Sequence, residues 1–175
     1  MEEQYIKIDE DGNKFYYKNK RMTIEHRLDG PAIEWADGGN EWYVDGKRHR
    51  IDGPAVEWAD GSKVWYVDGK LHRLDGPAFE YAGGYKAWYV DGKRHRLDGS
   101  AIEHTGGYKE WWVDGKRHRL DGPAFEYANG SKEWYVDGKH LSEHDFNALS
   151  KPLELTLDQI AAKFGVDVKN LKIVK

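Results

Sequence analysis

A histidine followed by an arginine recurs along this chain, and each copy has a glutamate eight residues after the histidine. The histidines are His26, His49, His72, His95 and His118, and the glutamates are Glu34, Glu57, Glu80, Glu103 and Glu126. A histidine beside a carboxylate could act in general acid–base catalysis. An enzyme needs one distinctive site, however, and five near-equal copies without an added nucleophile do not supply one. We therefore expect no catalytic residue, and ladders in which His and Arg bind carbonyls and carboxylates at turns.

The same repeat gives little support for a metal site or a phosphate-binding site. Successive histidines bring no second ligand at short spacing and the chain has no cysteine, so neither a metal site nor a cofactor is expected. The pairs Gly83-Gly84 and Gly106-Gly107 stand where hairpin turns are expected, and no phosphate loop followed by a helix is present. They are predicted to be turns.

Rows of aromatic residues are the better indication of function. One ring per copy falls on a predicted face that is otherwise polar: Tyr43, Tyr66, Tyr89, Trp112 and Tyr135. Arginines recur beside them as Arg50, Arg73, Arg96 and Arg119. Exposed rings next to arginines can anchor a protein partner or stack on bases. The alternative is that a second layer or a second copy of the chain covers these rings.

The fourth copy departs from the others at three positions. Ser100 replaces a proline, His104 replaces a tryptophan or tyrosine, and Trp112 replaces a tyrosine. Local inconsistency in a repeat favours a functional site, with drift as the alternative. We predict that His104, Tyr108, Trp111 and Trp112 lie at or beside a binding surface. The complete predicted set is Tyr66, Tyr89, Arg96, His104, Tyr108, Trp111, Trp112 and Arg119.

These residues belong to a 23-residue repeat, which reads HRIDGPAVEWADGSKVWYVDGKL from His49 to Leu71. Two short strand-like runs flank Asp60-Gly61, a pattern typical of a hairpin with a two-residue type I′ turn. That register places Val56 opposite Trp65. The position of Val64, which drifts to glutamate or alanine in other copies, is then predicted to face water.

Turns join one hairpin to the next at Asp68-Gly69 and at Asp75-Gly76-Pro77, where glycine is expected to supply a positive φ. A single hairpin is unstable in water, so the units must stack. The predicted fold is mainly β: a stacked antiparallel β-hairpin array, either a single twisted sheet or a solenoid, with a short C-terminal helical cap.

Both ends of the array are atypical. Residues 1–25 form a degenerate N-terminal half-repeat with Tyr16 at the tryptophan position, 26–140 hold five repeats, and 141–175 form the helical cap. Ser142 is predicted to begin a helix through Leu149, Thr156 with Gln159 to begin a second that ends at Gly165, and 171–174 to form a final strand. The stretch from Leu157 to Leu171 also resembles the first half of a helix-turn-helix and the start of a LysM module, but capping is expected.

The composition indicates the class of protein and the compartment in which it acts. The 175 residues contain no cysteine, 27 basic and 31 acidic residues and a net charge of −4. This charge disfavours a polyanion-binding surface, and the absence of cysteine suits a reducing cytoplasm. No apolar run is long enough to cross a membrane, and Met1 is followed by two glutamates instead of an export signal. We expect a cytoplasmic protein without a membrane role.

The repeat resembles two known groups. The strings Asp45-Gly-Lys-Arg-His49 and Ala59-Asp-Gly-Ser62, with the aromatic pair before the turn, are similar to MORN repeats. That resemblance implies stacked β-hairpins used for protein and sometimes lipid contact. The chain more closely resembles bacterial and tailed-phage proteins built of WYxNGKxHRxDGPA units that end in Leu-Thr-Leu-Asp-Gln-Ile and Lys-Ile-Val-Lys, here Leu155–Ile160 and Lys172–Lys175. This implies a phage or bacterial setting but no established activity.

The sequence therefore predicts a non-catalytic binding protein, phage-encoded and acting in the host cytoplasm, that engages a host or viral protein, for example as an inhibitor. A sponge for a nucleotide or short nucleic acid, held between aromatic and His-Arg ladders, is the alternative. A homo-oligomer is compatible with both.

Overall fold

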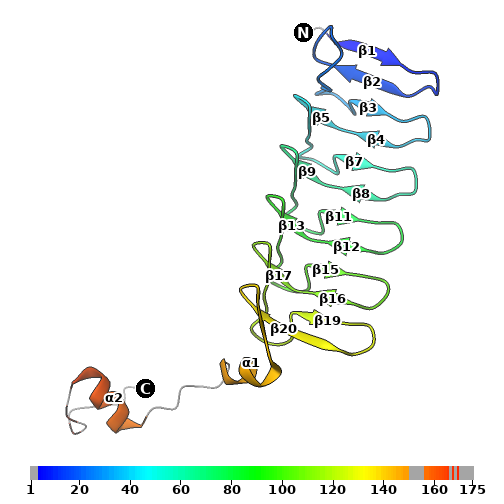
Figure 1. The fold of residues 1–175 in the computed structure, drawn as a ribbon. Coiled ribbons are helices and arrows are strands. Elements are labelled where there is room, and N and C mark those ends of the chain that lie inside the picture. Colours follow the sequence, from blue (N-terminus) through cyan, green and yellow to red (C-terminus); the bar gives the residue numbers. More distant parts are fainter. Residues whose placement is uncertain (1–3, 150–155, 166, 168, 170–175) are drawn as a thin grey trace.

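In the computed structural model, the chain forms a stack of short hairpins, and the structure describes residues 4–149, 156–165, 167 and 169 (Figure 1). The stack confirms the predicted mainly β hairpin array. A sheet of 13 strands runs its whole length, and every repeat contributes two adjacent strands. In spatial order these strands are β1 (Tyr5–Ile8), β2 (Lys14–Tyr17), β3 (Ile33–Glu34), β4 (Asn40–Glu41), β7 (Val56–Glu57), β8 (Lys63–Val64), β11 (Phe79–Glu80), β12 (Lys86–Ala87), β15 (Ile102–Glu103), β16 (Lys109–Glu110), β19 (Phe125–Glu126), β20 (Lys132–Val136) and β21 (Lys139–Leu141).

A second, smaller hairpin follows in each of the first four repeats, and these hairpins lie along one side of the stack (Figure 1). They pair β5 (Tyr43–Val44) with β6 (Lys47–Arg48), β9 (Tyr66–Val67) with β10 (Lys70–Leu71), β13 (Tyr89–Val90) with β14 (Lys93–Arg94), and β17 (Trp112–Val113) with β18 (Lys116–Arg117). In the fifth repeat, the single strand β20 covers both the part that belongs to the long sheet and the part that belongs to the small hairpin. In the other repeats, the small hairpin therefore continues the direction of the strand before it.

The predicted two-residue turn at Asp60-Gly61 is wrong. Trp58 N donates to Ser62 O and Gly61 N donates to Trp58 O, which closes a three-residue loop over Ala59–Gly61. Only Gly61 of this loop has a positive φ, whereas a type I′ turn needs two such residues. Val56 therefore pairs with Val64 instead of Trp65. One additional loop residue shifts the partner strand by one position and reverses its faces.

The type I′ geometry occurs instead at Asp68-Gly69, where φ is 50° and 77°. Val67 and Lys70 pair directly across this turn, so it is the tip of a small hairpin and not a connection between hairpins. Gly76, in contrast, is absent from the positive-φ residues, against our expectation. A Cβ at Gly76 would lie 2.8 Å from Arg73 Cζ, so a side chain there would push the guanidinium away from the backbone.

The core is a thin layer of small and β-branched residues. One alanine per repeat is 0% exposed: Ala32, Ala55, Ala78, Ala101 and Ala124. Val56 and Val64 are buried side by side, so the expectation that the Val64 position faces water is also wrong. Strands of two residues are too short to enclose a core within one repeat. The apolar residues of each repeat are therefore covered by the neighbouring repeats.

The two ends of the array differ from the repeats between them. At the start, β1 pairs with β2, and Tyr16 N donates to Ala32 O as Trp42 N does to Ala55 O in the next repeat. At the other end, α1 (Glu143–Leu149) packs against β20 and β21 with Phe146 buried. The hydroxyl of Ser142 accepts from Asp145 N, which confirms the predicted start.

The second helix, α2 (Leu157–Phe164), also has the predicted termini. Thr156 and Gln159 form a reciprocal capping box, and Gly165 adopts a left-handed conformation with φ 64°. The strand predicted at 171–174 lies outside the described residues. Within the parts of the chain that the structure describes, neither helix has the length and apolar character needed to span a bilayer.

The filled alanine layer gives a test of this packing. Ala78→Leu is expected to lower the free energy of unfolding by about 1–3 kcal/mol, because the added atoms have no space between adjacent repeats. The control is Leu74→Ala in the same repeat, where the side chain is exposed and a change within about 0.5 kcal/mol is expected. Chemical denaturation measures both, and equal effects would contradict the packing described.

Candidate functional site

The array presents two long faces with different chemistry. Side chains at the positions of Trp58, Val64, Tyr66 and Leu71 share one face, which we call the aromatic face. Those at the positions of Arg50, Ile51, Trp65 and Val67 lie on the other, which we call the groove face. Adjacent residues of an extended strand point to opposite sides, so Trp65 and Tyr66 must separate in this way.

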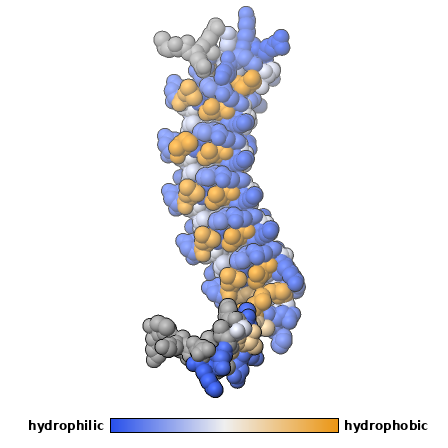
Figure 2. All heavy atoms as spheres, turned by 90° about the vertical axis from the view of Figure 1, so that its left-hand side faces the viewer, coloured by the Kyte–Doolittle hydropathy of each residue, from blue (hydrophilic) through white to orange (hydrophobic). Residues whose placement is uncertain are grey.

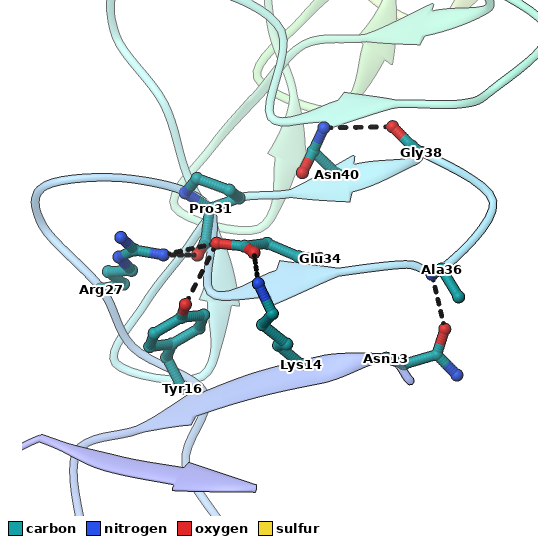
Figure 3. Close-up of polar contacts among 9 residues, drawn as sticks. All are labelled: Asn13, Lys14, Tyr16, Arg27, Pro31, Glu34, Ala36, Gly38 and Asn40. Atoms are coloured by element: carbon teal, nitrogen blue, oxygen red, sulfur yellow. Dashed lines mark hydrogen bonds and ion pairs between the residues drawn. The ribbon is translucent and has the colours of Figure 1, made fainter. Parts of the chain in front are cut away.

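On the groove face an arginine fastens each repeat to the one before it. In the first case, shown in Figure 3, Arg27 Nη1 donates to Pro31 O at 3.2 Å and to Glu34 Oε1 at 2.7 Å. Its guanidinium carbon lies 4.0 Å from the ring centroid of Tyr16. Arg27 Nε also donates to Asp29 at 2.9 Å. One side chain thus closes its own loop and covers a ring of the preceding unit.

The same arrangement recurs in every repeat. The guanidinium lies 3.9–4.0 Å from the centroid of a tryptophan in the pairs Arg50–Trp42, Arg73–Trp65, Arg96–Trp88 and Arg119–Trp111. Each of these arginines also binds one aspartate, one glutamate and one loop carbonyl; for Arg96 these are Asp98, Glu103 and Ser100 O. The hydrogen bond from Arg96 lowers the pKa of Asp98. Arg96 and Arg119, predicted to bind a ligand, are therefore held by internal contacts.

Grooves of similar shape separate successive loops on this face. One of about 650 Å³ is lined by Ile51, Trp65, Val67 and Leu74, with Asp52 and Asp75 at its edges. Equivalent grooves follow along the array, one with Leu74, Trp88 and Leu97 and one with Leu97, Trp111 and Leu120. Hydrophobic patches recur at each level on the side of the small hairpins (Figure 2). The groove face is thus periodic in both shape and polarity.

A row of almost fully exposed aliphatic side chains borders these grooves. The residue after each arginine is 65–80% exposed: Leu28, Ile51, Leu74, Leu97 and Leu120. Sequence reasoning missed this row, although the signal was present: an apolar residue stands between Arg and Asp-Gly in every copy. Single exposed apolar residues are ordinary, but a row of them at regular spacing favours an interaction site.

The histidines serve the turns, in line with the expected ladders. His49 Nδ1 lies 2.9 Å from Asp68 Oδ1 and accepts from Asp68 N, at the tip of the small hairpin of its own repeat. His72, His95 and His118 repeat this contact with Asp91, Asp114 and Asp137. The aspartates adopt the left-handed conformation with φ near 50°. The contact holds each in a backbone state that non-glycine residues rarely adopt.

The aromatic face contains buried carboxylates that the sequence did not reveal. Glu41, at the position predicted to be wet, is 6% exposed. It accepts from Trp35 Nε1 at 3.2 Å, Tyr43 Oη at 3.0 Å and Arg48 Nε at 2.9 Å. Glu110 is buried in the same way by Trp112 Nε1 and Arg117 Nε. Glu41 and Glu110 are therefore satisfied ion-pair partners and not solvated residues.

Arginines and rings alternate along this face. Arg48 lies between Tyr43 and Tyr66, at 5.8 and 5.6 Å from their centroids, and Arg117 lies between Trp112 and Tyr135, at 5.3 Å from each. Burial, and then the charge of Glu41, raise the pKa of Tyr43 to about 12. Tyr66, Tyr89 and Trp112 are half-buried in this column, so the rings are covered in part by the chain itself.

The unusual residues of the fourth repeat have partners. His104 stacks on Tyr108 with centroids 4.5 Å apart, and its Nδ1 accepts from Gly106 N at 2.8 Å. In the first, second and fifth repeats a different bond supports this turn, from a backbone N–H to a loop aspartate or asparagine, for example from Ser62 N to Asp60. Ser100 is buried and donates to Glu103. These residues support the local fold, and their part in a binding surface stays a prediction.

The eight predicted site residues thus divide between the two faces. Tyr66, Tyr89, His104, Tyr108 and Trp112 lie on the aromatic face. Arg96, Trp111 and Arg119 line one groove on the other face. No group of three or more His, Asp or Glu side chains suited to a metal ion occurs among the described residues. A comparison with protein families and a comparison with curated proteins each gave no match for this chain.

The buried ion pair of the first repeat can be tested against the second repeat, which has Val64 and Leu71 at the same positions. Glu41→Val and Arg48→Leu should each lower the free energy of unfolding by about 1–3 kcal/mol, because each leaves a buried partner unsatisfied. The double variant should recover at least half of the summed loss. Chemical denaturation of the four proteins completes the cycle, and additive losses would contradict a direct pair.

Proposed function

We propose that this protein is a non-catalytic scaffold that binds another protein along its groove face. The observation that carries the proposal is the row formed by Leu28, Ile51, Leu74, Leu97 and Leu120, 65–80% exposed, beside successive grooves that run from Ile51 to Leu120. Repeat proteins commonly use such extended periodic surfaces for recognition.

The spacing and charge of the groove face favour an extended, basic segment as the partner. Each repeat adds two strands to the sheet, so neighbouring grooves are about 9.5 Å apart. Three residues of an extended polyproline II segment span about 9.3 Å, so every third side chain meets an equivalent groove. The groove edges carry aspartates that are 80–85% exposed, and the arginine beside each is already paired with two carboxylates. Lysine or arginine between the apolar residues would complement this edge.

The nucleotide-binding alternative has weaker support. Phosphate recognition would need the arginines that follow the histidines, and in each repeat that arginine already binds an aspartate, a glutamate and a carbonyl and covers a ring. A phosphate would have to displace these contacts before it gained its own. Following the resemblance of the repeats, we place the protein partner in the bacterial cytoplasm, as a host or phage protein.

A random-peptide library selected on the immobilised protein tests the groove face. We expect selected peptides to carry apolar residues at every third position with Lys or Arg between them. Leu74→Ser with Leu97→Ser should weaken their binding at least tenfold, because each lost contact removes about 1 kcal/mol or more. Tyr81→Ser, at an exposed hairpin tip, is the matched control and should leave affinity unchanged. Peptides without this period, or equal binding to the Leu74/Leu97 double variant, would overturn the proposal.

Self-association is the competing use of the same row, and sedimentation velocity over a range of protein concentrations separates the two. The proposal expects the same monomeric species for the wild-type protein and for the Leu74/Leu97 double variant. A dimer that dissociates in this variant would show that a second copy occupies the grooves, and would replace the proposed partner.

A further inference from the structure

Two facing positions in the middle of the aromatic face have an unusual charge in the third repeat. In the first and fourth repeats they hold a glutamate and an arginine, Glu41 with Arg48 at 2.9 Å and Glu110 with Arg117 at 3.1 Å. In the second they hold Val64 and Leu71, which carry no charge. The third repeat keeps the arginine, Arg94, but has Ala87 at the glutamate position. Among the five repeats, it alone has a cation there without an acid of its own.

The contacts of Arg94 reflect this difference. In Arg48 and Arg117 the Nε donates to a carboxylate, whereas Arg94 Nε donates to the neutral hydroxyl of Tyr89 at 3.2 Å. Within residues 4–149 and 156–165, every other arginine of the repeats has a carboxylate within 4 Å, and Arg94 has none. The nearest acid on this face, Glu110, already accepts from Trp112 Nε1 and Arg117 Nε.

The surroundings of Arg94 suit an anion. Arg94 is half-buried, and its guanidinium carbon lies 5.0 Å from the ring centroid of Trp112. Tyr85, at a position that holds glycine or serine in three repeats and tyrosine also in the fourth, lies close enough to Arg94 and Tyr89 for their charges to act on its pKa, which burial raises. A half-buried guanidinium gains more from a bound carboxylate than an exposed one, because solvent screens the pair less.

We propose that Arg94 and Tyr89 bind a carboxylate in the position that the side chains of Glu41 and Glu110 occupy in their own repeats. Glutamate differs from alanine by the heavy atoms of an acetate ion, so a ligand of that size completes the third repeat. The Tyr89 hydroxyl would donate to it as Tyr43 does to Glu41, and the guanidinium would donate as Arg48 does. This site lies on the opposite face from the grooves and does not depend on the function proposed for them.

Acetate is therefore the probe, titrated at constant ionic strength against sodium chloride and followed by ¹⁵N NMR. The Nε–H signal of Arg94 and the indole N–H signal of Trp112 should shift and saturate with acetate but not with chloride. A linear response, equal for the two salts, would overturn the site, since it would report ionic strength only.

Three variants taken from the protein's own repeats sharpen the test. Ala87→Glu should supply the carboxylate within the chain, raise the melting temperature and abolish the saturable shift. Ala87→Val with Arg94→Leu reproduces the second repeat, so it should stay folded and should not respond to acetate. Glu110→Ala is the positive control, because it should create a second acetate response at Arg117. A saturable shift that persists in Ala87→Glu would show that acetate binds elsewhere.

The carboxylate could belong to a small molecule or to a glutamate of a protein partner, and a second titration separates these sources. N-acetylglutamate amide presents the side-chain carboxylate with a blocked backbone. Binding at least tenfold tighter than acetate would assign the site to a glutamate side chain, and equal or weaker binding would assign it to a small carboxylate.

Discussion

The stacking of one arginine per repeat on the tryptophan of the preceding repeat is the contact on which the rest of the array depends. Strands of two residues bury little area, so a unit alone gains too little from packing to offset the entropy of ordering it. Arg50 compensates by joining three parts at once: the ring of Trp42, the carboxylates of Asp52 and Glu57, and the carbonyl of Pro54. Gly53 suits this contact, because a Cβ there would lie 2.9 Å from the guanidinium carbon and would displace it. The fixed spacing of the HRxDGPA motif thus results from this one contact of the arginine, which recurs in every repeat.

Local signals in the sequence predict most of the array, but they do not predict the register of its strands. The period, the helix starts at Ser142 and Thr156 and the array itself follow from local signals that need no knowledge of packing, and so do the places of the turns but not their types. The register does not, because Asp60-Gly61 fits both a two-residue and a three-residue loop. The additional loop residue changed the face assigned to Val64, and with it the interpretation of Glu41 and Glu110 as solvated. A carboxylate that three donors surround has the same letter in the sequence as one in water.

Two of the residues that break the repeat rule have a structural explanation, whereas two that keep it have none in the core. His104 and Ser100 have turn and loop partners of their own, so their departure from the consensus has a structural explanation. Leu74 and Leu97 keep the rule and yet contribute little to the core, since about four fifths of each side chain is exposed. A position that stays apolar in every copy while it remains in solvent does not stabilise the fold by burial, and its retention needs another cause.

The two faces therefore suit different kinds of recognition. On the groove face every level offers nearly the same chemistry, so a partner with a matching period can engage several grooves, and weak contacts add through their connection in one chain. On the aromatic face the central pair changes from Glu41–Arg48 to Val64–Leu71 to Ala87–Arg94, so neighbouring levels differ. A charge that is half-buried without a partner lowers the stability of the fold, and this restricts which substitutions the column tolerates. An external group gains the most binding free energy at a level where the chain itself supplies no partner for such a charge. In the function that we propose, the periodic face would supply affinity through repetition, and the variable face would supply selectivity at a single level.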